Sequence, residues 1–347
     1  MDSKQLNMDD TLVLKGIAII AIMIHNFVHR IPWSIPENQH VFALENNHQL
    51  IECFQNGGPH LLLNLFSHYG HYGVPVFIFF SGYGLVLKYE YMREKISFGK
   101  YIRKHANKLW LLLLPLLIPH FLFLSIRESG YFQEHWADLI LMMGFLGNFQ
   151  PDAYVFHGPW WFFSLIAQLY VIYYIFVYHH TLKPIIILSV VCMAGQFLAV
   201  SHDNWECLKY LRYNFAGSML PFVLGIVMAR KNIYLTRKTM IIILLLFIVC
   251  CFNRYTWLLT FGLIAVAILP VIKLIRLNSK IYSSFKWIGI ISAFLFVIHP
   301  IIRECIFGLH KYALYVSIFV YLALCVLGAC MYRVGIDWCR QCISTIK

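Results

Sequence analysis

Long apolar runs, separated by short polar or basic segments, make up most of the chain. A helix needs roughly 20 consecutive apolar residues to cross a bilayer. The pattern therefore predicts an all-α integral membrane protein, a bundle of about ten transmembrane helices forming one membrane domain over residues 1–347. The expected spans are residues 12–31, 72–88, 109–126, 160–178, 184–200, 213–229, 239–252, 255–275, 288–306 and 312–334.

The basic residues orient these spans, because positively charged loops stay in the cytoplasm. Lysine and arginine gather in three connections, at residues 88–108, 230–238 and 273–286. Ten spans with a cytoplasmic N-terminus place all three connections, and the C-terminus, inside. The apolar stretch 137–147 has only 11 residues and, counted as a span, would move two of the three connections outside. It is therefore expected to be an interfacial or re-entrant piece.

This topology leaves two outer loops, residues 32–71 and 127–159, and a cytoplasmic basic amphipathic segment, residues 89–108. The first loop has five histidines and three glutamates but no lysine or arginine. Two interpretations of it stay open: an ordered lid or acceptor site, and a solvated linker. Its histidines have no HxxxH helical spacing, and the single CxxC (Cys339 and Cys342) has no second pair. No metal site is expected.

Composition supports the membrane assignment and excludes some functions. Hydrophobic residues make up 60% of the chain and charged residues 13%, whereas soluble domains carry about 25% charged residues. The net charge of +12 is concentrated in the cytoplasmic connections, so no nucleic-acid partner is expected. The acidic start, "MDSKQLNMDD", differs from the basic start of a cleavable signal peptide, so the first span is expected to remain.

The first span, "LKGIAIIAIMIHNFVH", carries polar groups where they are costly. Lys15 lies near its cytoplasmic end, and His25 is ten residues on, ~15 Å higher along a helix. His29 lies one turn beyond His25, and Asn26 is one turn from His29. Histidine suits proton transfer near neutral pH. A packing role, with His25 hydrogen-bonded to a neighbouring helix, is the alternative.

Other spans also carry polar side chains at depth. By count along the helices, His25, Ser81, Gln168 and His299 lie at comparable heights, which predicts one polar substrate chamber and leaves Ser81, Gln168 and His299 as candidates to stabilise an oxyanion. For Ser81, beside Gly82, helix packing is the alternative. The residues assigned to the chamber are His29, Ser81, Trp161, Ser164, Gln168, His299 and Arg303.

The basic segment before the third span has two open interpretations. It can be drawn to anionic lipid, at about 1 kcal/mol per basic residue. Alternatively, Arg103 can give forked contacts to the phosphates of a cytosolic ligand while neighbouring lysines act as point charges. The residues concerned are Lys100, Arg103, Lys104 and Lys108.

Six segments that follow one another along most of the chain carry a resemblance: "LKGIAIIAIMIHNF", "VPVFIFFSGYGL", "FGKYIRKHANKLWLLLLP", "WWFFSLIAQLY", "PFVLGIVMAR" and "FLFVIHPII". Taken in order, they resemble the membrane-bound acyltransferase 3 family of bacterial surface-sugar O-acyltransferases. It implies a multi-pass protein of the cytoplasmic membrane that takes an acyl group, usually acetyl, from acyl-CoA. The implied acceptor is a hydroxyl of an extracytoplasmic carbohydrate.

The resemblance also implies residue roles. His25 would be the catalytic base and Lys15 its cytoplasm-facing partner, with CoA phosphates on Arg103 and the neighbouring lysines. The family pattern leaves ten residues between the basic residue and the histidine, whereas nine separate Lys15 from His25 and the ten-gap position is Asn26. Many relatives also have a pair of glutamates before the glutamine of the fourth span, where this chain has Ile166 and Ala167.

The main alternative is a multi-pass transporter or flippase, because buried histidines also serve proton relays. No pair of broken helices in an inverted repeat, common in transporters, is evident in the sequence. A structural or sensing subunit is a third class. In every case membrane lipid is a partner and an oligomer is possible. We expect acyl-CoA as the acyl donor, with no metal.

Overall fold

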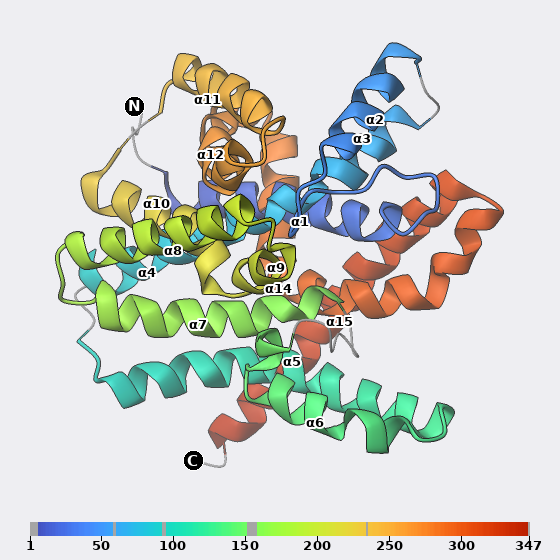
Figure 1. Cartoon of the computed structure of the whole chain (residues 1–347). Helices are drawn as coiled ribbons and strands as arrows, with labels where there is room; N and C mark the ends of the chain where they lie inside the picture. Colours follow the sequence, from blue (N-terminus) through green and yellow to red (C-terminus); the bar gives the residue numbers. More distant parts are fainter. Residues whose placement is uncertain (1–5, 58–59, 92–94, 151–157, 234, 346–347) are drawn as a thin grey trace. The chain divides into compact units, whose positions relative to one another are not determined.

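The computed structural model describes residues 6–57, 60–91, 95–150, 158–233 and 235–345, and this part of the chain contains only helices and their connections (Figure 1). By contact, the chain divides into two compact units, which are described separately. Unit 1 comprises Met1–Ile96 and Gln168–Ile290, and unit 2 comprises Ser97–Ala167 and Ile291–Lys347. The protein is a helical, multi-pass membrane bundle.

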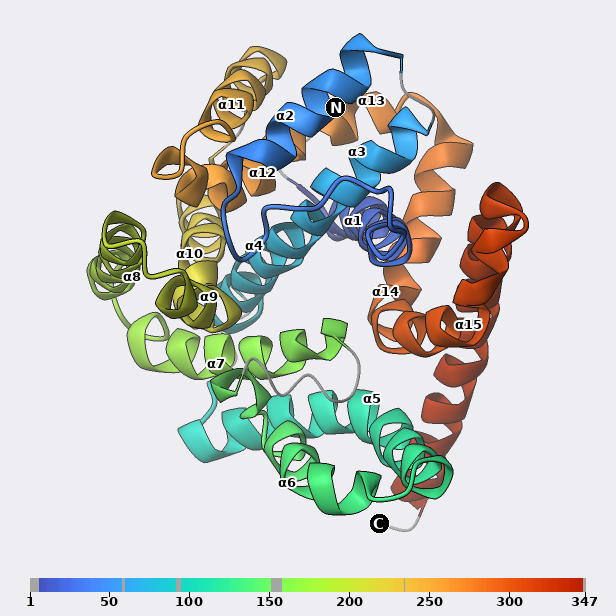
Figure 2. The same ribbon diagram turned by 45° about the vertical axis from the view of Figure 1, so that its right-hand side comes forward.

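Unit 1 holds most of the helices, together with the C-terminal part of α7 and the N-terminal part of α14. Figure 2 shows α11 beside α12 within this unit. The helices are α1 (Met8–Val28), α2 (Leu44–Gln55), α3 (Leu61–Tyr69), α4 (Gly73–Val86), α7 (Trp161–Phe176), α8 (Lys183–Ser201), α9 (Trp205–Tyr213), α10 (Phe215–Lys231), α11 (Arg237–Cys250), α12 (Thr260–Ala267), α13 (Ile272–Ile275) and α14 (Ser279–Ile306).

Small residues bring the helices of unit 1 into backbone contact, as is common between membrane helices. On α4, a Cβ at Gly82 would lie 2.4 Å from the carbonyl oxygen of Phe222. On α10, a Cβ at Gly225 would lie 2.1 Å from the carbonyl oxygen of Phe79. Each helix thus needs a glycine opposite the other, and the α4–α10 pair forms the centre of the unit.

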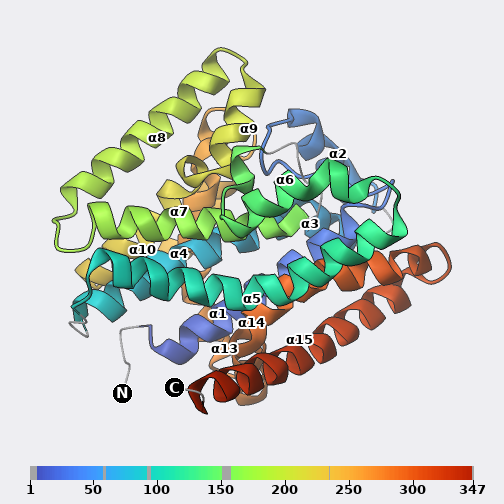
Figure 3. The ribbon, with the colours of Figure 1, turned by 90° about the horizontal axis from the view of Figure 1, so that it is seen from below.

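Unit 2 contains α5 (Phe98–Arg127), α6 (Tyr131–Met143) and α15 (Leu314–Thr345), with the N-terminal part of α7 and the C-terminal part of α14. Figure 3 shows α6 folded back along α5. The indole nitrogen of Trp160 donates to the carbonyl of Val297, 3.0 Å away, and the ring of Phe162 lies 5.0 Å from that of Phe296. These contacts join α7, and the 3₁₀ turn (Gly158–Trp160) that precedes it, to α14 inside the unit.

The membrane spans agree with the predicted helical bundle. In the described residues, eight helical stretches are long and apolar enough to cross a membrane, and the bent pair α9–α10, with a 47° break, makes nine. The remaining predicted span, residues 239–252, corresponds to α11, which has only 14 residues. The side of the membrane that each end faces stays a prediction, as does one domain over residues 1–347.

Two predicted segments differ from the helices observed. Residues 32–71, expected to be a loop, contain α2 and α3, and α3 continues through a 3₁₀ turn (Gly70–Tyr72) into α4. Gly70 lets the end of this stretch approach α1 closely. Residues 98–108 of the predicted basic segment are the first turns of α5. Residues 92–94 and 151–157, parts of the predicted 89–108 and 127–159 segments, lie outside the described residues.

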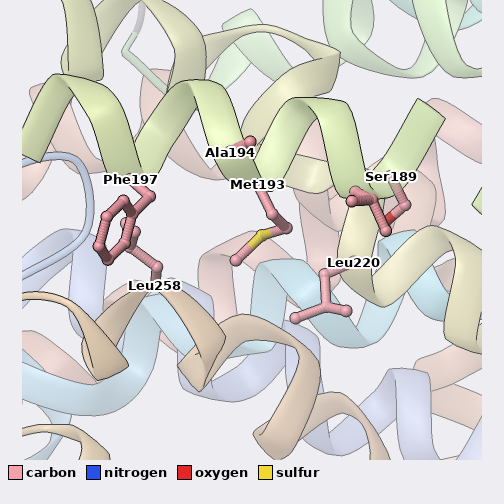
Figure 4. Close-up of a pocket in the computed structure, with 7 residues that line it drawn as sticks. Ser189, Met193, Ala194, Phe197, Leu220 and Leu258 are labelled. Atoms are coloured by element: carbon pink, nitrogen blue, oxygen red, sulfur yellow. The ribbon is translucent and has the colours of Figure 1, made fainter. Parts of the chain in front are cut away.

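An apolar groove of ≈ 380 Å³ lies on unit 1 along α8 (Figure 4). Met193, Ala194 and Phe197 of α8 line it, opposite Leu220 and Leu258. Ser189 is its one polar side chain. A groove without acid, base or charged side chains offers no catalytic group, so the chemistry must be sought elsewhere in the unit.

Candidate active site

The centre of the candidate site is His25, near the end of α1 and only 4% exposed. Its Nδ1 lies 2.8 Å from the carbonyl oxygen of Ser67 and 3.3 Å from that of Phe66, both on α3. A carbonyl only accepts hydrogen bonds, so Nδ1 must carry the proton. In the neutral ring Nε2 then holds the lone pair, and Nε2 makes no hydrogen bond to any described residue. The ring is oriented as a general base requires.

The sequence produces this orientation through the stretch "SHYGHYG", residues 67–73. A Cβ at Gly70 would lie 2.5 Å from the Cβ of His25 and 2.7 Å from the carbonyl oxygen of Ala21. A Cβ at Gly73 would lie 2.5 Å from the carbonyl oxygen of Ala18. Only glycine fits at these contacts, and the close approach places the last turn of α3 over the imidazole.

Two further histidines lie against His25. The ring of His29 stacks on it at 4.7 Å between centroids, and Nδ1 of His29 donates to the His25 carbonyl at 2.9 Å. The ring of His71 meets it edge-on at 5.7 Å. His71 is 1% exposed, and neither of its ring nitrogens has a hydrogen-bond partner among the described residues. The predicted proximity of His29 to His25 is therefore present in unit 1.

A buried arginine also lies near His71. Arg212, at the end of α9, is 1% exposed, and its guanidinium carbon lies 4.1 Å from the centre of the Trp257 ring and 4.3 Å from that of Phe261. Its Nε donates to the carbonyl of Gln39 at 2.7 Å. Arg212 and His71 lie within electrostatic range of each other.

His40 completes this side of the site from the segment after α1. Its ring stacks on Tyr213 at 3.7 Å. Desolvation lowers the pKa of His40 well below its usual value, and the positive charges of Arg212 and Lys209 lower it further. His40 therefore stays neutral near pH 7, whereas the buried Arg212 keeps its positive charge.

Side chains of the first outer segment hold the site together. His68 on α3 has Nδ1 2.7 Å from the carbonyl oxygen of Pro36 and Nε2 3.0 Å from Oδ1 of Asn47. Asn47 in turn donates to the carbonyl of Cys251 at 2.7 Å. Glu37 lies within electrostatic range of His25. These contacts make part of residues 32–71 a packed segment that orders the surroundings of His25. Its roles as a lid or an acceptor site stay predictions.

The other predicted residues of α1 lie apart from the imidazole. Nζ of Lys15 lies 5.8 Å from the centre of the Phe80 ring of α4. The side chain of Asn26 donates to the carbonyl of Ile22, 2.9 Å away in its own helix. Of the two positions that match the family histidine, His25 is thus the one turned toward α3.

Two residues predicted for the chamber in unit 1 make structural hydrogen bonds. The Ser81 hydroxyl donates to the carbonyl of Phe77 at 2.9 Å, one turn back in α4. The Gln168 amide donates to Oδ1 of Asn214 at 2.8 Å, and its oxygen accepts from the Phe215 amide at 2.9 Å. Gln168 therefore fixes the break between α9 and α10, beside Arg212.

Four predicted residues lie in unit 2. Ser164 and His299 are fully buried, and the Ser164 hydroxyl and Nε2 of His299 have no hydrogen-bond partner among the described residues. Nδ1 of His299 contacts the carbonyl oxygen of Leu295 at 3.0 Å, and Arg303 donates to Glu304 at 2.9 Å. Trp161 is half-buried, whereas its neighbour Trp160 is the anchored indole. Their place in one chamber with His25 stays a prediction.

The predicted CoA-binding residues form an exposed stripe on the first turns of α5, while Tyr101 and His105 of the same turns are buried. The stripe comprises Lys100, Arg103, Lys104 and Lys108. Its exposure suits either a phosphorylated ligand or anionic lipid. Among the described residues, no group of three or more His, Cys, Asp or Glu side chains is arranged to hold a metal ion.

Sequence reasoning missed Gly70, His71 and Arg212 as parts of the site. The two glycines spaced three apart in residues 67–73 were a signal for close helix contact. Arg212 had a signal as well, an arginine beside Asn214 at the start of an apolar helix. No pattern within the sequence indicated that these segments meet at His25.

Comparison with known proteins identifies a family. The family model described as an acyltransferase domain matches residues 10–333. No curated protein and no solved structure matches the chain. The matched range covers every residue of the candidate site, from Lys15 to Arg303.

Proposed function

The chain belongs to the acyltransferase 3 family, and we propose that it transfers an acyl group, acetyl above all, from cytosolic acyl-CoA to a hydroxyl of an extracytoplasmic carbohydrate. Family membership makes the protein a membrane acyltransferase, which requires an acyl donor and an acceptor. Acyl-CoA as the donor and a carbohydrate as the acceptor belong to the proposal, as does the location of the protein in the cytoplasmic membrane.

The observation that carries the catalytic assignment is the contact of His25 Nδ1 with the Ser67 carbonyl at 2.8 Å. A tertiary hydrogen bond to the protonated nitrogen fixes the tautomer and leaves the Nε2 lone pair for the substrate. General bases of this kind contribute 10²–10⁴-fold in rate. We assign His25 as the base, in preference to Asn26, which cannot accept a proton near neutral pH.

In the proposed reaction, Nε2 of His25 takes the proton of the acceptor hydroxyl as its oxygen attacks the thioester carbonyl carbon. The tetrahedral intermediate collapses with breakage of the carbon–sulfur bond. The imidazolium of His25 then returns its proton to the departing CoA thiolate, so the products are the O-acyl ester and CoA thiol. Direct transfer needs no covalent enzyme intermediate.

The donor site is proposed at the exposed basic stripe of α5. Arg103 can make forked contacts to a CoA phosphate, with Lys100, Lys104 and Lys108 adding positive charge. The helical rise of ~15 Å between Lys15 and His25 is a distance that an extended pantetheine arm can cover. This supports entry of the thioester from the cytoplasmic end and of the hydroxyl from the outer end.

The test measures two quantities on the purified full chain: binding of CoA, and transfer of radiolabelled acetyl from acetyl-CoA to surface glycan precursors. His25→Ala should lower transfer by at least 100-fold with CoA affinity unchanged. Asn26→Ala, its matched control one residue along the helix, should keep transfer within a few-fold. Arg103→Ala should weaken CoA affinity, whereas Lys183→Ala, which removes an exposed charge on α8, should not.

Each part of the proposal has its own contrary result. If His25→Ala retained acetyl transfer, His25 would not be the base. If Asn26→Ala lost transfer, the essential residue would be Asn26. Unchanged CoA affinity in Arg103→Ala would place the nucleotide elsewhere. A protein that binds no CoA, and instead moves substrate across vesicles without acylating it, would be a transporter.

A further inference from the structure

The guanidinium of Arg212 has more hydrogen-bonding capacity than the protein uses. Arginine carries five N–H donors in a planar fork. Nε–H donates to the Gln39 carbonyl, while Nη1 and Nη2, both buried, have no hydrogen-bond partner among the described residues. Trp257 and Phe261 contact the charge as aromatic rings, which orient the guanidinium but accept no conventional hydrogen bond.

The positive charge of Arg212 is buried without a compensating anion among the described residues, which a role in packing alone does not explain. Burying an ion is expensive unless another charge or hydrogen bonds compensate it. No carboxylate of a described residue forms an ion pair with Arg212, whereas Arg230 pairs with Glu90 and Arg276 with Asp10 in the same unit. The groups within electrostatic range of it, His40, His71 and Tyr72, are not anions near pH 7.

The position of Arg212 connects it with the catalytic imidazole. His71 lies within electrostatic range of Arg212 and meets the His25 ring edge-on at 5.7 Å. Both ring nitrogens of His71 are also without a hydrogen-bond partner among the described residues. His71 is thus a neighbour of both His25 and Arg212 within unit 1, and the guanidinium of Arg212 has unused donors.

From this geometry we propose that Arg212 and His71 bind an anionic group, a carboxylate or a phosphate, of the acyl acceptor. The paired Nη donors match the two oxygens of such a group, as in bidentate arginine contacts. An acceptor held there would present a neighbouring hydroxyl toward His25. This rests on the proposed function for the reaction itself and adds the class of acceptor: a charged carbohydrate rather than a neutral one.

The test measures equilibrium binding of three soluble probes to the detergent-purified full chain: glucuronate, glucose 1-phosphate, and glucose as the neutral control. At least one anionic probe should bind wild type ten times more tightly than glucose. Preference for glucuronate identifies a carboxylate acceptor, and preference for glucose 1-phosphate a phosphorylated one. Arg212→Gln should remove the preference and leave glucose binding unchanged, while Arg212→Lys should retain part of it.

The matched control is Arg254→Gln. Arg254 also lies over an aromatic ring, Tyr255 at 5.0 Å, but it pairs with Asp203 at the surface. Its loss should leave the anion preference intact. Two results would overturn the proposal: wild type that binds neither anion better than glucose, and Arg212→Gln that keeps the preference although it elutes and melts as a folded protein. If Arg212→Gln does not fold, the proposal is still tested by Arg212→Lys and by the binding of anionic probes and glucose to wild type.

Failure of this inference is distinguishable from failure of the proposed function. His25→Ala should bind the anionic probe as wild type does, because the ring contributes no contact to Arg212. Anion preference together with full transfer activity in His25→Ala would remove the base and keep the anion site. Wild type without an anion preference, together with lost transfer in His25→Ala, would keep the base and remove the anion site.

Discussion

His25 of unit 1 and His299 of unit 2 are both buried imidazoles in apolar helices, yet they are held differently. Nδ1 of His25 contacts the Ser67 carbonyl, which belongs to another helix and lies 42 residues along the chain. Nδ1 of His299 contacts the Leu295 carbonyl of its own helix. A hydrogen bond within one helix satisfies the ring nitrogen whatever the position of the neighbouring helices. A hydrogen bond between helices also fixes the ring relative to other elements.

The neighbours of the two rings differ in the same way. His25 lies against His29 and His71, with Arg212 beyond, so several groups able to bind or move protons and anions face one another. The ring of His299 contacts Phe296 at 5.7 Å, and the cation within electrostatic range of it, Arg303, belongs to the same helix as well. Both histidines lie deep in apolar helices, so depth does not distinguish a functional histidine from a structural one. The groups that orient the ring are the better criterion.

The largest effect should come from disturbing the orientation of His25 without altering its chemistry. Gly70→Ala puts a Cβ 2.5 Å from the Cβ of His25, so α3 or α1 must shift. A displacement of about 1 Å at a catalytic group can cost 100-fold, and overpacking costs typically 1–3 kcal/mol of stability. Transfer rate and thermal melting of the purified protein would measure both effects.

Gly84→Ala is the matched control, because a Cβ there has nothing within 4 Å. It lies on α4 and should change neither transfer nor melting. Equal activity in the Gly70 and Gly84 variants would mean that the α3–α1 contact does not set the geometry of the base.

How much of this site follows from sequence depends on whether a group acts within its own helix or across helices. The helical rise and the cost of polar groups in a bilayer made His25 a candidate, whose role as a base stays a prediction. The order of motifs was enough to identify the family that the model match confirms. The same reasoning placed Ser81 and Gln168 at a common height. It could not give their directions, and in the structure Ser81 turns to its own helix and Gln168 caps α10.

Arg212 and His71 show why the rest was out of reach. The two residues are 141 positions apart, and their proximity depends on α9 ending beside the α3–α4 turn. Neither helical period nor hydropathy carries that information, since both describe one element at a time. The first outer segment was similarly open between lid and linker, because its packing depends on contacts between residues far apart in the sequence, His68 with Pro36 and Asn47 with Cys251.

A smaller effect is expected from the other histidine. His299→Gln removes a ring whose Nδ1 is satisfied locally, so the transfer rate should stay within about tenfold of wild type, less than the loss of a general base, which costs 10²–10⁴-fold. The stability measured by thermal melting should fall by about 1 kcal/mol, the usual net value of one hydrogen bond. A loss of transfer as large as that of His25→Ala, in a protein that still melts normally, would show that both imidazoles serve the chemistry.

The smallest effect is a pH dependence of stability from His40. Its pKa in the folded protein lies below the ordinary value of 6.5, so the folded state binds fewer protons than the unfolded state as pH falls through 6.5. Stability should therefore fall below that pH, by at most about 1.4 kcal/mol per pH unit for one proton. His40→Phe keeps a ring to stack on Tyr213 and should melt with a flatter pH profile between pH 6.5 and 5.5, whereas His202→Gln, at an exposed position, should follow wild type. A profile in His40→Phe as steep as that of wild type would mean that His40 is not the group whose lowered pKa makes stability depend on pH in this range.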